Sequence, residues 1–328
     1  MAPETFGSQT IWLFNQSSEI IMTDFRIVFI FVDGLGIGEK DHKFNPNTTD
    51  KTGIFLNFLN QKNGSIPFGG VSIPLDATLG VPGLPQSATG QTTLLTGVNA
   101  AKFIGGHKSG FPNKALRELL KQKSLLKQLK DAGKKAAFIN AFRPIFFKLD
   151  DRLKWLLSTT TVANLSAELP FFTLKDVEER CSIYQDFTNK DLIKKGFNIP
   201  EFTPEEAGEI LAEQTNHYDF ILYEYFKTDR AGHSQDFGRA AREIEKLGRF
   251  LVSFLSAIDL KTTQVILTSD HGNIEDLRTN AHTRNPAMTI MWGPLTEEWS
   301  QSLSSLADVT PTILKALTAS ENLKKIVK

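Results

Sequence analysis

Several stretches of this sequence place acidic and imidazole side chains directly after apolar runs. The richest of them begins with the β-branched run Val265–Leu267 and continues into Asp270 and His271, and His282 comes eleven residues after His271. A carboxylate and two imidazoles are side chains that bind transition-metal ions. Because open α/β sheets carry their chemistry at the carboxyl ends of strands and in the following loops, this stretch predicts half of a metal site.

Asp229 and His233 supply the other half of the expected site. They stand four residues apart, shortly after the apolar run Phe220–Tyr225. On a helical turn, side chains with this spacing lie on one face, so both can reach one cation. The two ligand sets that we expect are Asp229, His233 and His282 for one cation, and Asp33, Asp270 and His271 for the other. Carboxylates and imidazoles without a thiolate suit two divalent ions such as manganese or zinc better than calcium or magnesium.

A hydroxyl group is expected between the two cations. Two metals roughly 3.5–4 Å apart can clamp the attacking and leaving oxygens of an in-line displacement at phosphorus, and such a site needs a nucleophile. Ser87 follows a proline-rich approach and begins a predicted helix. Because the N–H groups at a helix N-terminus favour a phosphoryl anion, Ser87 is the predicted nucleophile.

The elements that must position these residues alternate between strand and helix. Phe25–Val32 is almost continuously apolar, which is typical of a strand covered on both faces. Further strands are expected at Lys135–Asn140, Phe220–Tyr225, Val265–Leu267 and Ala287–Trp292, and helices from Ser87, at Ala115–Ala132, from the capping box Thr203–Glu206, at about Gly238–Ala257 and at Leu306–Thr318. This alternation predicts an α/β core with a mostly parallel central sheet flanked by helices.

The alternation stops after Arg143 and Pro144. Residues 145–202 mix aromatic side chains, short helical pieces and loops, so we expect them to form a small inserted cap. The core then comprises residues 23–144 and 203–328, and residues 1–22 form an N-terminal extension.

Composition limits the possible partners. The chain has 37 basic and 37 acidic residues and no net charge, which argues against nucleic acid or a membrane surface as a partner. The only cysteine, Cys181, excludes an internal disulfide framework and a cysteine-based zinc cluster. The first 22 residues lack the basic and apolar regions of a signal peptide, and no apolar run is long enough to span a bilayer, so a cytoplasmic location is expected. Nothing in the sequence indicates the oligomeric state.

Five motifs together resemble the alkaline phosphatase superfamily, and within it the cofactor-independent phosphoglycerate mutase and phosphopentomutase branch. They are VDGLG (32–36), SATGQ (87–91), KTDRAGH (227–233), SDHGN (269–273) and AHTRNP (281–286), in the order of that family. The resemblance implies an alkaline-phosphatase-like core in which Ser87 is both nucleophile and metal ligand. The implied ligand sets are Asp33, Ser87, Asp270 and His271 for one metal, and Asp229, His233 and His282 for the other. Thr93 is the alternative hydroxyl in its segment, but it lacks the glycine that follows Ser87 three residues later, Gly90.

Two departures from that branch bear on the activity. Gln91 stands where the mutases usually have a histidine, and residues 145–202 are much shorter than the inserted domain of phosphoglycerate mutases. We therefore expect a phosphatase that acts on a small phosphate ester through a phosphoserine. The alternatives are a phosphomutase and a non-catalytic metal-binding relative. A dinucleotide-binding oxidoreductase, suggested by the glycines of VDGLGIG, is disfavoured because Asp33 would repel a pyrophosphate.

Basic residues near the motifs are candidates for substrate binding. They are Arg143, Arg230, Lys227, His107 and Arg284. An arginine suits bidentate recognition of a phosphate, and Arg143 is our first choice because it stands at the junction of core and cap. The alternative for each of them is a solvated surface charge.

Overall fold

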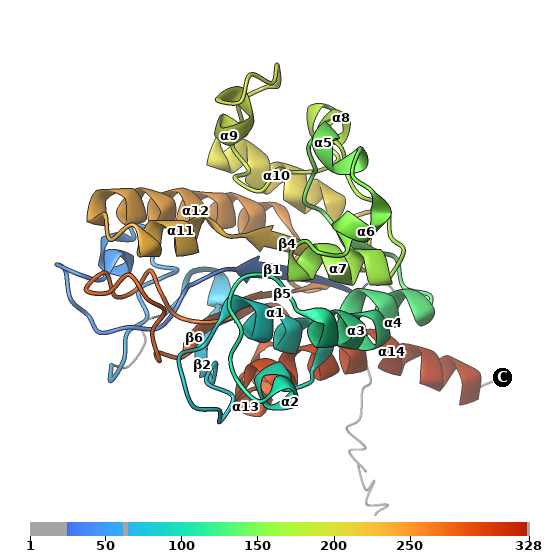
Figure 1. Cartoon of the computed structure of the whole chain (residues 1–328), viewed down its shortest axis with the longest axis horizontal. Coiled ribbons are helices and arrows are strands. Elements are labelled where there is room, and N and C mark those ends of the chain that lie inside the picture. Colours follow the sequence, from blue (N-terminus) through green and yellow to red (C-terminus); the bar gives the residue numbers. More distant parts are fainter. Residues whose placement is uncertain (1–24, 62–64, 327–328) are drawn as a thin grey trace, which may run out of the picture.

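A six-stranded sheet lies at the centre of the chain (Figure 1). The structure, a computed structural model, describes residues 25–61 and 65–326, and of residues 319–326 only the backbone. The N-terminal extension expected at residues 1–22 lies outside the described residues. The strands are β1 (Arg26–Val32), β2 (Val71–Leu75), β3 (Ala136–Phe138), β4 (Phe220–Tyr225), β5 (Thr263–Thr268) and β6 (Ala287–Trp292), and their order across the sheet is β2-β6-β5-β1-β4-β3.

The pairing of the strands confirms the predicted fold class. β1 lies between β4 and β5 and is parallel to both, and β3 is parallel to β4. Only β6 and β2, at one edge, run antiparallel to their neighbours. The carboxyl ends of β1, β4 and β5 therefore meet at one edge of the sheet, which is where the predicted ligands follow them.

Helices cover both faces of the sheet (Figure 1). They are α1 (Ser87–Thr96), α2 (Ala100–Ile104), α3 (Lys114–Lys123), α4 (Leu125–Asp131), α5 (Pro144–Phe147), α6 (Asp151–Lys154), α7 (Thr159–Ser166), α8 (Leu174–Glu178), α9 (Lys190–Ile193), α10 (Pro204–Gln214), α11 (Lys227–His233), α12 (Phe237–Ala257), α13 (Thr296–Ser302) and α14 (Val309–Ile326), with 3-10 turns at Pro46–Thr49, Pro67–Gly69 and Leu306–Asp308. Among the described residues, no helix combines the length and the apolar character needed to cross a membrane.

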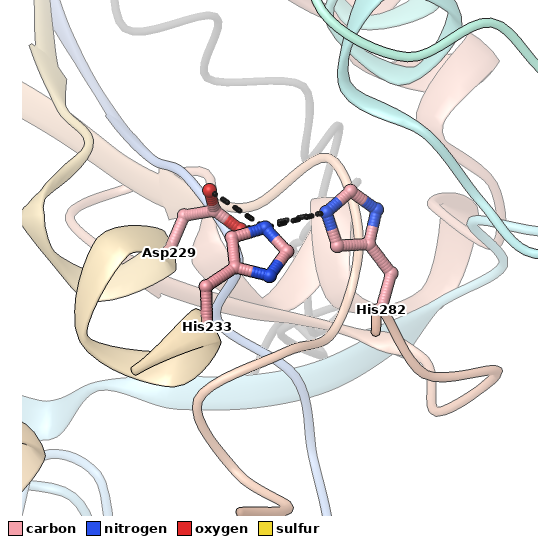
Figure 2. A group of neighbouring side chains, drawn as sticks. All are labelled: Asp229, His233 and His282. Carbon is pink, nitrogen blue, oxygen red and sulfur yellow. Dashed lines mark hydrogen bonds and ion pairs between the residues drawn. The ribbon is translucent and has the colours of Figure 1, made fainter. Parts of the chain in front are cut away.

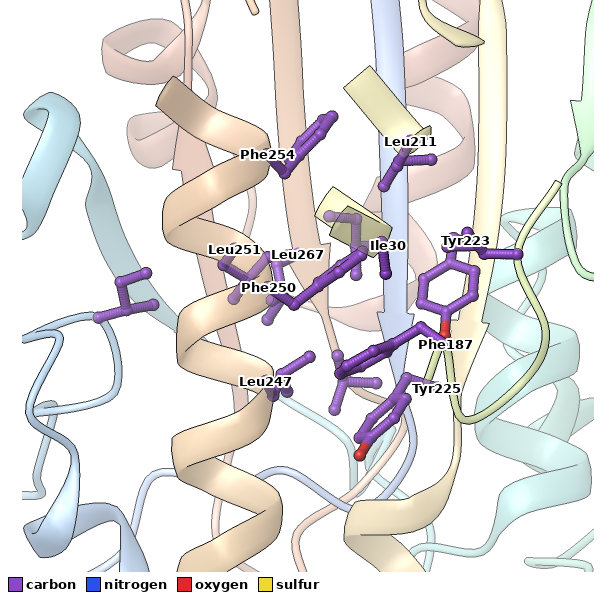
Figure 3. Close-up of a cluster of buried hydrophobic side chains, with 14 of the residues drawn as sticks. Ile30, Phe187, Leu211, Tyr223, Tyr225, Leu247, Phe250, Leu251, Phe254 and Leu267 are labelled. Carbon is purple, nitrogen blue, oxygen red and sulfur yellow. The ribbon is translucent and has the colours of Figure 1, made fainter. Parts of the chain in front are cut away.

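The side chains of β1 explain its continuous apolar run. Val28, Ile30 and Val32 belong to a buried cluster with α10 and α12, whereas Ile27, Phe29 and Phe31 belong to a second cluster on the opposite face with α1, α4 and α14. Figure 3 shows Leu211 of α10 and Phe250 of α12 pointing toward Ile30. Because successive side chains of a strand point to opposite faces, both sets must be apolar when both faces are covered.

The helix expected from Ser87 is confirmed, since α1 begins at Ser87 and Gln86 is its N-cap. The single helix expected at Ala115–Ala132 is two helices, α3 and α4, because the extended residue Ser124 ends the first and caps the second by accepting a hydrogen bond from the Lys127 amide. β2 was not expected, because it is a partly exposed edge strand that contains Pro74.

The segment 145–202 contributes α5 to α9. Its side chains reach both faces of the sheet, since Val162 and Ala163 of α7 join the cluster with α4, and Ile183 and Phe187 join the cluster with α12. The division into core and cap stays a prediction, and the segment shares its buried side chains with the core.

Candidate metal centre and active site

Five loops and helix ends meet beyond the carboxyl ends of β1, β4 and β5. Asp33 directly follows β1, α11 begins two residues after β4, and Asp270 and His271 follow β5. His282 lies in the loop before β6, and Ser87 begins α1. The parallel pairing of these three strands is what brings their ends together.

One side-chain group combines Asp229 and His233 of α11 with His282 (Figure 2). Its candidate ligand atoms all lie within 4.8 Å of one another. His233 Nε2 is 3.3 Å from Asp229 Oδ2, and His282 Nε2 is 3.6 Å from Asp229 Oδ1. The two Nε2 atoms are 3.3 Å apart.

The hydrogen bonds of the two Nδ1 atoms define the tautomers of His233 and His282. His233 Nδ1 donates to the Asn280 carbonyl at 2.7 Å, and His282 Nδ1 donates to the Pro85 carbonyl at 2.9 Å. A neutral imidazole that carries its proton on Nδ1 presents a lone pair at Nε2. Two such lone pairs and a carboxylate therefore face one point, and the carbonyls orient the rings in the way usual for metal-bound histidines.

A second group surrounds His271. His271 Nε2 is 3.4 Å from Asp33 Oδ1, 3.4 Å from Asp270 Oδ2 and 3.0 Å from Ser87 Oγ. Ligand atoms of Asp33, Asp229 and His271 lie within 4.8 Å of one another, so Asp229 takes part in both groups. The rings of His271 and His282 stack with their centroids 3.7 Å apart. The structure thus brings all seven expected ligands into one continuous cluster.

Burial disfavours charge on four residues of this cluster, Asp33, Asp270, His271 and His282. Burial and the neighbouring Asp270 and Asp229 hold the pKa of Asp33 well above its usual range, and burial with Asp229 raises the pKa of Asp270 to about 8. Burial also lowers the pKa values of His271 and His282, so neither imidazole supplies a positive charge. The described residues therefore place carboxylates and neutral imidazoles together without a cationic side chain between them.

These observations fit divalent cations. Asp33 Oδ1 is buried and has no hydrogen-bond partner among the described residues. Oxygen and nitrogen donors without a thiolate are the ligand types expected for manganese or zinc. A cation would pair with the buried carboxylates and accept the Nε2 lone pairs of the histidines.

Ser87 is held against the cluster by the close packing of α1. Gly90 lies one turn after Ser87, and a Cβ atom there would stand 2.7 Å from the Asp270 carbonyl oxygen. The cap residue Gln86 makes no side-chain hydrogen bond to α1, and the Thr89 amide donates to the Lys108 carbonyl at 3.4 Å. The amides of Ser87 and Ala88, at the start of this ten-residue helix, are therefore the ones available to an anion. Thr93, the alternative hydroxyl, is buried and donates to the Thr89 carbonyl within the helix.

Sequence reasoning missed three residues that hold the ligands in place. Gln91 Nε2 lies 3.3 Å from Asp33 Oδ2 and 3.2 Å from Asp270 Oδ2, so it donates to both carboxylates. Asn273 Nδ2 donates to Asp229 Oδ1 at 2.6 Å. Both residues stand inside the quoted motifs, which is the signal that could have identified them.

Glu275 is the third of these residues and is buried. Its Oε2 accepts hydrogen bonds from the backbone amides of Gly36 and Asn273, and its Oε1 accepts from Thr283 Oγ1 and Asn285 Nδ2. One carboxylate thereby joins the loop after Asp33, the loop after His271 and the loop of His282. No pattern in the sequence signals this role.

A cavity of about 630 Å³ opens beside the cluster, and its lining includes Asp33, Ser87 and Asp229. Two of the expected substrate-binding residues, Arg143 and Arg230, line it, whereas Lys227 donates to Asp191 at 2.8 Å. His107 and Arg284 are not among its lining residues, and His107 Nε2 lies 3.3 Å from the Val81 carbonyl.

Three further ionisable residues that the sequence did not indicate also line this cavity, Tyr184, Lys195 and Glu224. Thr160 Oγ1 donates to Glu224 Oε2 at 2.6 Å. Burial raises the pKa of Glu224 to about 7.

Comparison with known proteins agrees with this geometry. The model of the Metalloenzyme superfamily matches residues 185–321, a stretch that contains Asp229, His233, Asp270, His271 and His282. The chain is 30% identical to the 2,3-bisphosphoglycerate-independent phosphoglycerate mutase of Desulforudis audaxviator over 124 residues. This aligned stretch covers 36% of this chain and 24% of that protein. The chain is also 31% identical to a mutase of this kind from Methanosarcina barkeri over 147 residues, and this stretch covers 43% of this chain and 27% of that protein. The matches thus cover about a quarter of the length of these curated relatives.

Solved structures share the fold over nearly the whole chain. The PH0037 protein from Pyrococcus horikoshii superposes with a TM-score of 0.55 at 15% identity, over 90% of this chain and 97% of that one. The alkaline phosphatase of the Antarctic bacterium TAB5 gives a TM-score of 0.50 at 13% identity, over 90% and 98%. The resemblance expected from the motifs, to phosphoglycerate mutases in sequence and to alkaline phosphatase in fold, is confirmed.

Proposed function

We propose that this chain is a two-metal phosphoryl-transfer enzyme that acts on a small phosphate ester through a phosphoserine at Ser87, and that hydrolysis is its main reaction. The observation that carries the proposal is the position of Ser87 Oγ, 3.0 Å from His271 Nε2. His271 in turn lies among the carboxylates of both candidate ligand groups. A hydroxyl at a helix N-terminus beside such a cluster is suited to attack phosphorus.

Seven side chains would hold the two cations, manganese or zinc. In this proposal Asp229, His233 and His282 bind one ion, and Asp33, Ser87, Asp270 and His271 bind the other. Ions bound there would lower the pKa of the Ser87 hydroxyl and offset the negative charge that develops on the leaving oxygen. Gln91 and Asn273 orient the carboxylates through the hydrogen bonds described above.

The reaction of the protein groups has two steps. Ser87 Oγ attacks phosphorus, the bond from phosphorus to the ester oxygen breaks, and the serine proton leaves with the alcohol. Water then attacks the phosphoserine, which releases phosphate and restores the Ser87 hydroxyl. In both steps, the free N–H groups of α1 and the helix dipole stabilise the oxygens of the phosphoryl group.

Arg143 and Arg230 are the proposed cationic contacts of the substrate. Both line the cavity, and neither has an ion-pair partner within 4.0 Å among the described residues. Lys227 is a weaker candidate because its ammonium group is engaged by Asp191. His107 and Arg284 would contact only a substrate that extends beyond the cavity lining.

Phosphomutase action is the second candidate, and the sequence similarity to phosphoglycerate mutases favours it. A mutase would return the phosphoryl group from Ser87 to a second hydroxyl of the same substrate instead of to water. A non-catalytic metal-binding protein is the third candidate. In all three cases we expect the protein to act in the cytoplasm, on a small molecule and without nucleic acid or a membrane.

The test is a screen of phosphorylated metabolites with manganese and with zinc that reads both free phosphate and isomerised product. Ser87→Ala should abolish phosphoryl transfer and leave the two metal ions per chain nearly intact. Ser109→Ala is the matched control, because Ser109 is exposed and its hydroxyl lies outside the cluster. Full activity in the Ser87→Ala protein would overturn the role of Ser87, and metal-loaded protein without activity on any ester would favour the non-catalytic candidate.

A further inference from the structure

Apolar side chains form a large part of the cavity lining, together with the residues of the candidate active site. We call six of them the apolar wall, namely Phe111, Phe142, Ile145, Phe146, Leu149 and Phe226. Because Ser87, Asp33 and Asp229 line the same cavity, a molecule whose phosphoryl group reaches Ser87 has this wall beside its remaining part. The volume, about 630 Å³, lies within the range of pockets that enclose drug-sized ligands.

The wall is a packed structure. The rings of Phe142 and Phe146 lie 4.4 Å apart, and Phe171 packs behind them at 4.9 and 4.7 Å between ring centroids. The Arg230 guanidinium lies over the Phe226 ring, 4.6 Å from its centroid. Aromatic contacts of this kind fix the ring positions, so the part of the wall formed by Phe142, Phe146 and Phe226 is preformed.

Two residues of the wall expose much of their apolar surface. Phe111 and Ile145 are each 58% exposed although both line the cavity. A small polar ester would leave this surface in water, whereas an apolar group would cover it and gain the free energy of removing apolar area from water. The apolar lining of the cavity therefore favours a leaving group with an apolar body over a small polar one.

We propose that the substrate is a phosphate monoester whose leaving alcohol carries an aromatic or aliphatic body, and that this body packs against the apolar wall. This inference rests on the proposed function, since it takes Ser87 as the point of attack. It assigns the wall as the part of the site that selects the substrate, and it disfavours phosphorylated sugars and glycerate, whose hydroxyl and carboxylate groups gain nothing from these rings.

The experiment compares benzyl phosphate with glycerol 1-phosphate, which are both esters of alkyl alcohols and differ mainly in apolar surface. We expect kcat/KM to be at least about tenfold higher for benzyl phosphate. Phe111→Ala should lower kcat/KM for benzyl phosphate by about tenfold and for glycerol phosphate by less than about twofold. Phe103→Ala is the matched control, because Phe103 is 55% exposed and lies outside the cavity lining, and it should change neither value.

Calorimetry provides a second measurement that does not depend on turnover. Benzylphosphonate should bind the metal-loaded protein at least about tenfold more tightly than 2-hydroxyethylphosphonate, and Phe111→Ala should remove this difference. Equal kcat/KM values for the two esters, or an equal loss for both in Phe111→Ala, would overturn the inference. If no ester is hydrolysed, the proposed function fails, and the two phosphonates still decide whether the wall binds an apolar group.

Discussion

Glu275→Gln is the substitution that tests how the metal-ligand loops are held. The Glu275 carboxylate is 1% exposed and accepts four hydrogen bonds, at 3.0 Å from the Gly36 amide, 2.7 Å from the Asn273 amide, 2.5 Å from Thr283 Oγ1 and 3.0 Å from Asn285 Nδ2. The surrounding backbone leaves no room for rearrangement, since a Cβ at Gly36 would stand 2.5 Å from Glu275 Cδ.

Glutamine keeps the shape of the side chain but replaces one acceptor oxygen by an NH2 group. Its oxygen can still accept from the two backbone amides, and its NH2 group can donate to the Thr283 hydroxyl, but this group then faces the Asn285 amide donor. Three bonds weaken from charge-assisted to neutral, and one is replaced by a contact between two donors. At about 0.5–1 kcal/mol for each weakened bond and about 1 kcal/mol for the lost one, the free energy of unfolding should fall by about 3 kcal/mol.

The effect on metal binding should be measurable separately. Glu275 joins the loops that carry Asp33, His271 and His282, so a looser junction should weaken metal affinity by about tenfold or more. Denaturant unfolding in the presence of a chelator gives the loss of fold stability, and calorimetric titration with manganese or zinc gives the loss of affinity.

Glu205→Gln is the matched control for this experiment. Glu205 pairs with Arg249 at 2.7 Å on the surface, with 44% of its side chain exposed, so its loss should cost less than about 1 kcal/mol and leave metal affinity unchanged. If the Glu275→Gln protein binds metal as tightly as the unsubstituted protein does, the carboxylate does not position the ligands and the reasoning is wrong.

Three other predictions concern the same region. Gly90→Ala should destabilise the fold by about 1–3 kcal/mol in denaturant unfolding, because its Cβ would meet the Asp270 carbonyl oxygen, whereas Gly106→Ala, with open space around its Cβ, should not. Glu224 has its pKa raised from 4.5 to about 7 by burial, so this group should contribute about 3 kcal/mol to the stability that the metal-free protein loses between pH 4.5 and 7, where only the unfolded chain ionises Glu224. Glu224→Gln should remove this loss, as unfolding at pH 5 and pH 8 would reveal, and an unchanged pH dependence would contradict it. Metal at a hundredfold excess over its dissociation constant should stabilise the fold by about 2.7 kcal/mol for each ion bound, and a chelator should reverse this in a thermal melt.

The strands were predictable because both of their faces are covered. β4 and β6 begin and end where the apolar runs do, and β1 begins one residue later than expected. A fully buried strand in a parallel sheet must be apolar at every position, so its limits appear directly in the sequence. β2 escaped prediction for the converse reason, because an exposed edge strand that contains a proline lacks this pattern.

In the candidate site, the sequence predicted the metal ligands but not the residues that orient them. Each ligand stands next to a strand or a helix whose position can be inferred locally, and parallel strands end at the same edge of the sheet. The residues that orient the ligands are different, because their partners are distant in the sequence. Gln91 bonds to Asp270, and Glu275 bonds to the amide of Gly36. Such pairs depend on the tertiary fold, and the periodicity of apolar residues in the sequence does not reveal them.

The glycines of the motifs follow from the same contacts. A Cβ at Gly232, in the motif of Asp229 and His233, would stand 2.3 Å from Asn273 Oδ1, and a Cβ at Gly272 would stand 2.3 Å from Glu275 Oε1. Gly232 therefore makes room for Asn273, which bonds to the ligand Asp229, and Gly272 makes room for Glu275, which bonds to the loops of Asp33 and His282. The motifs therefore supply closely packed contacts with one another as well as metal ligands. A change at one of these glycines should weaken metal binding although glycine itself supplies no ligand.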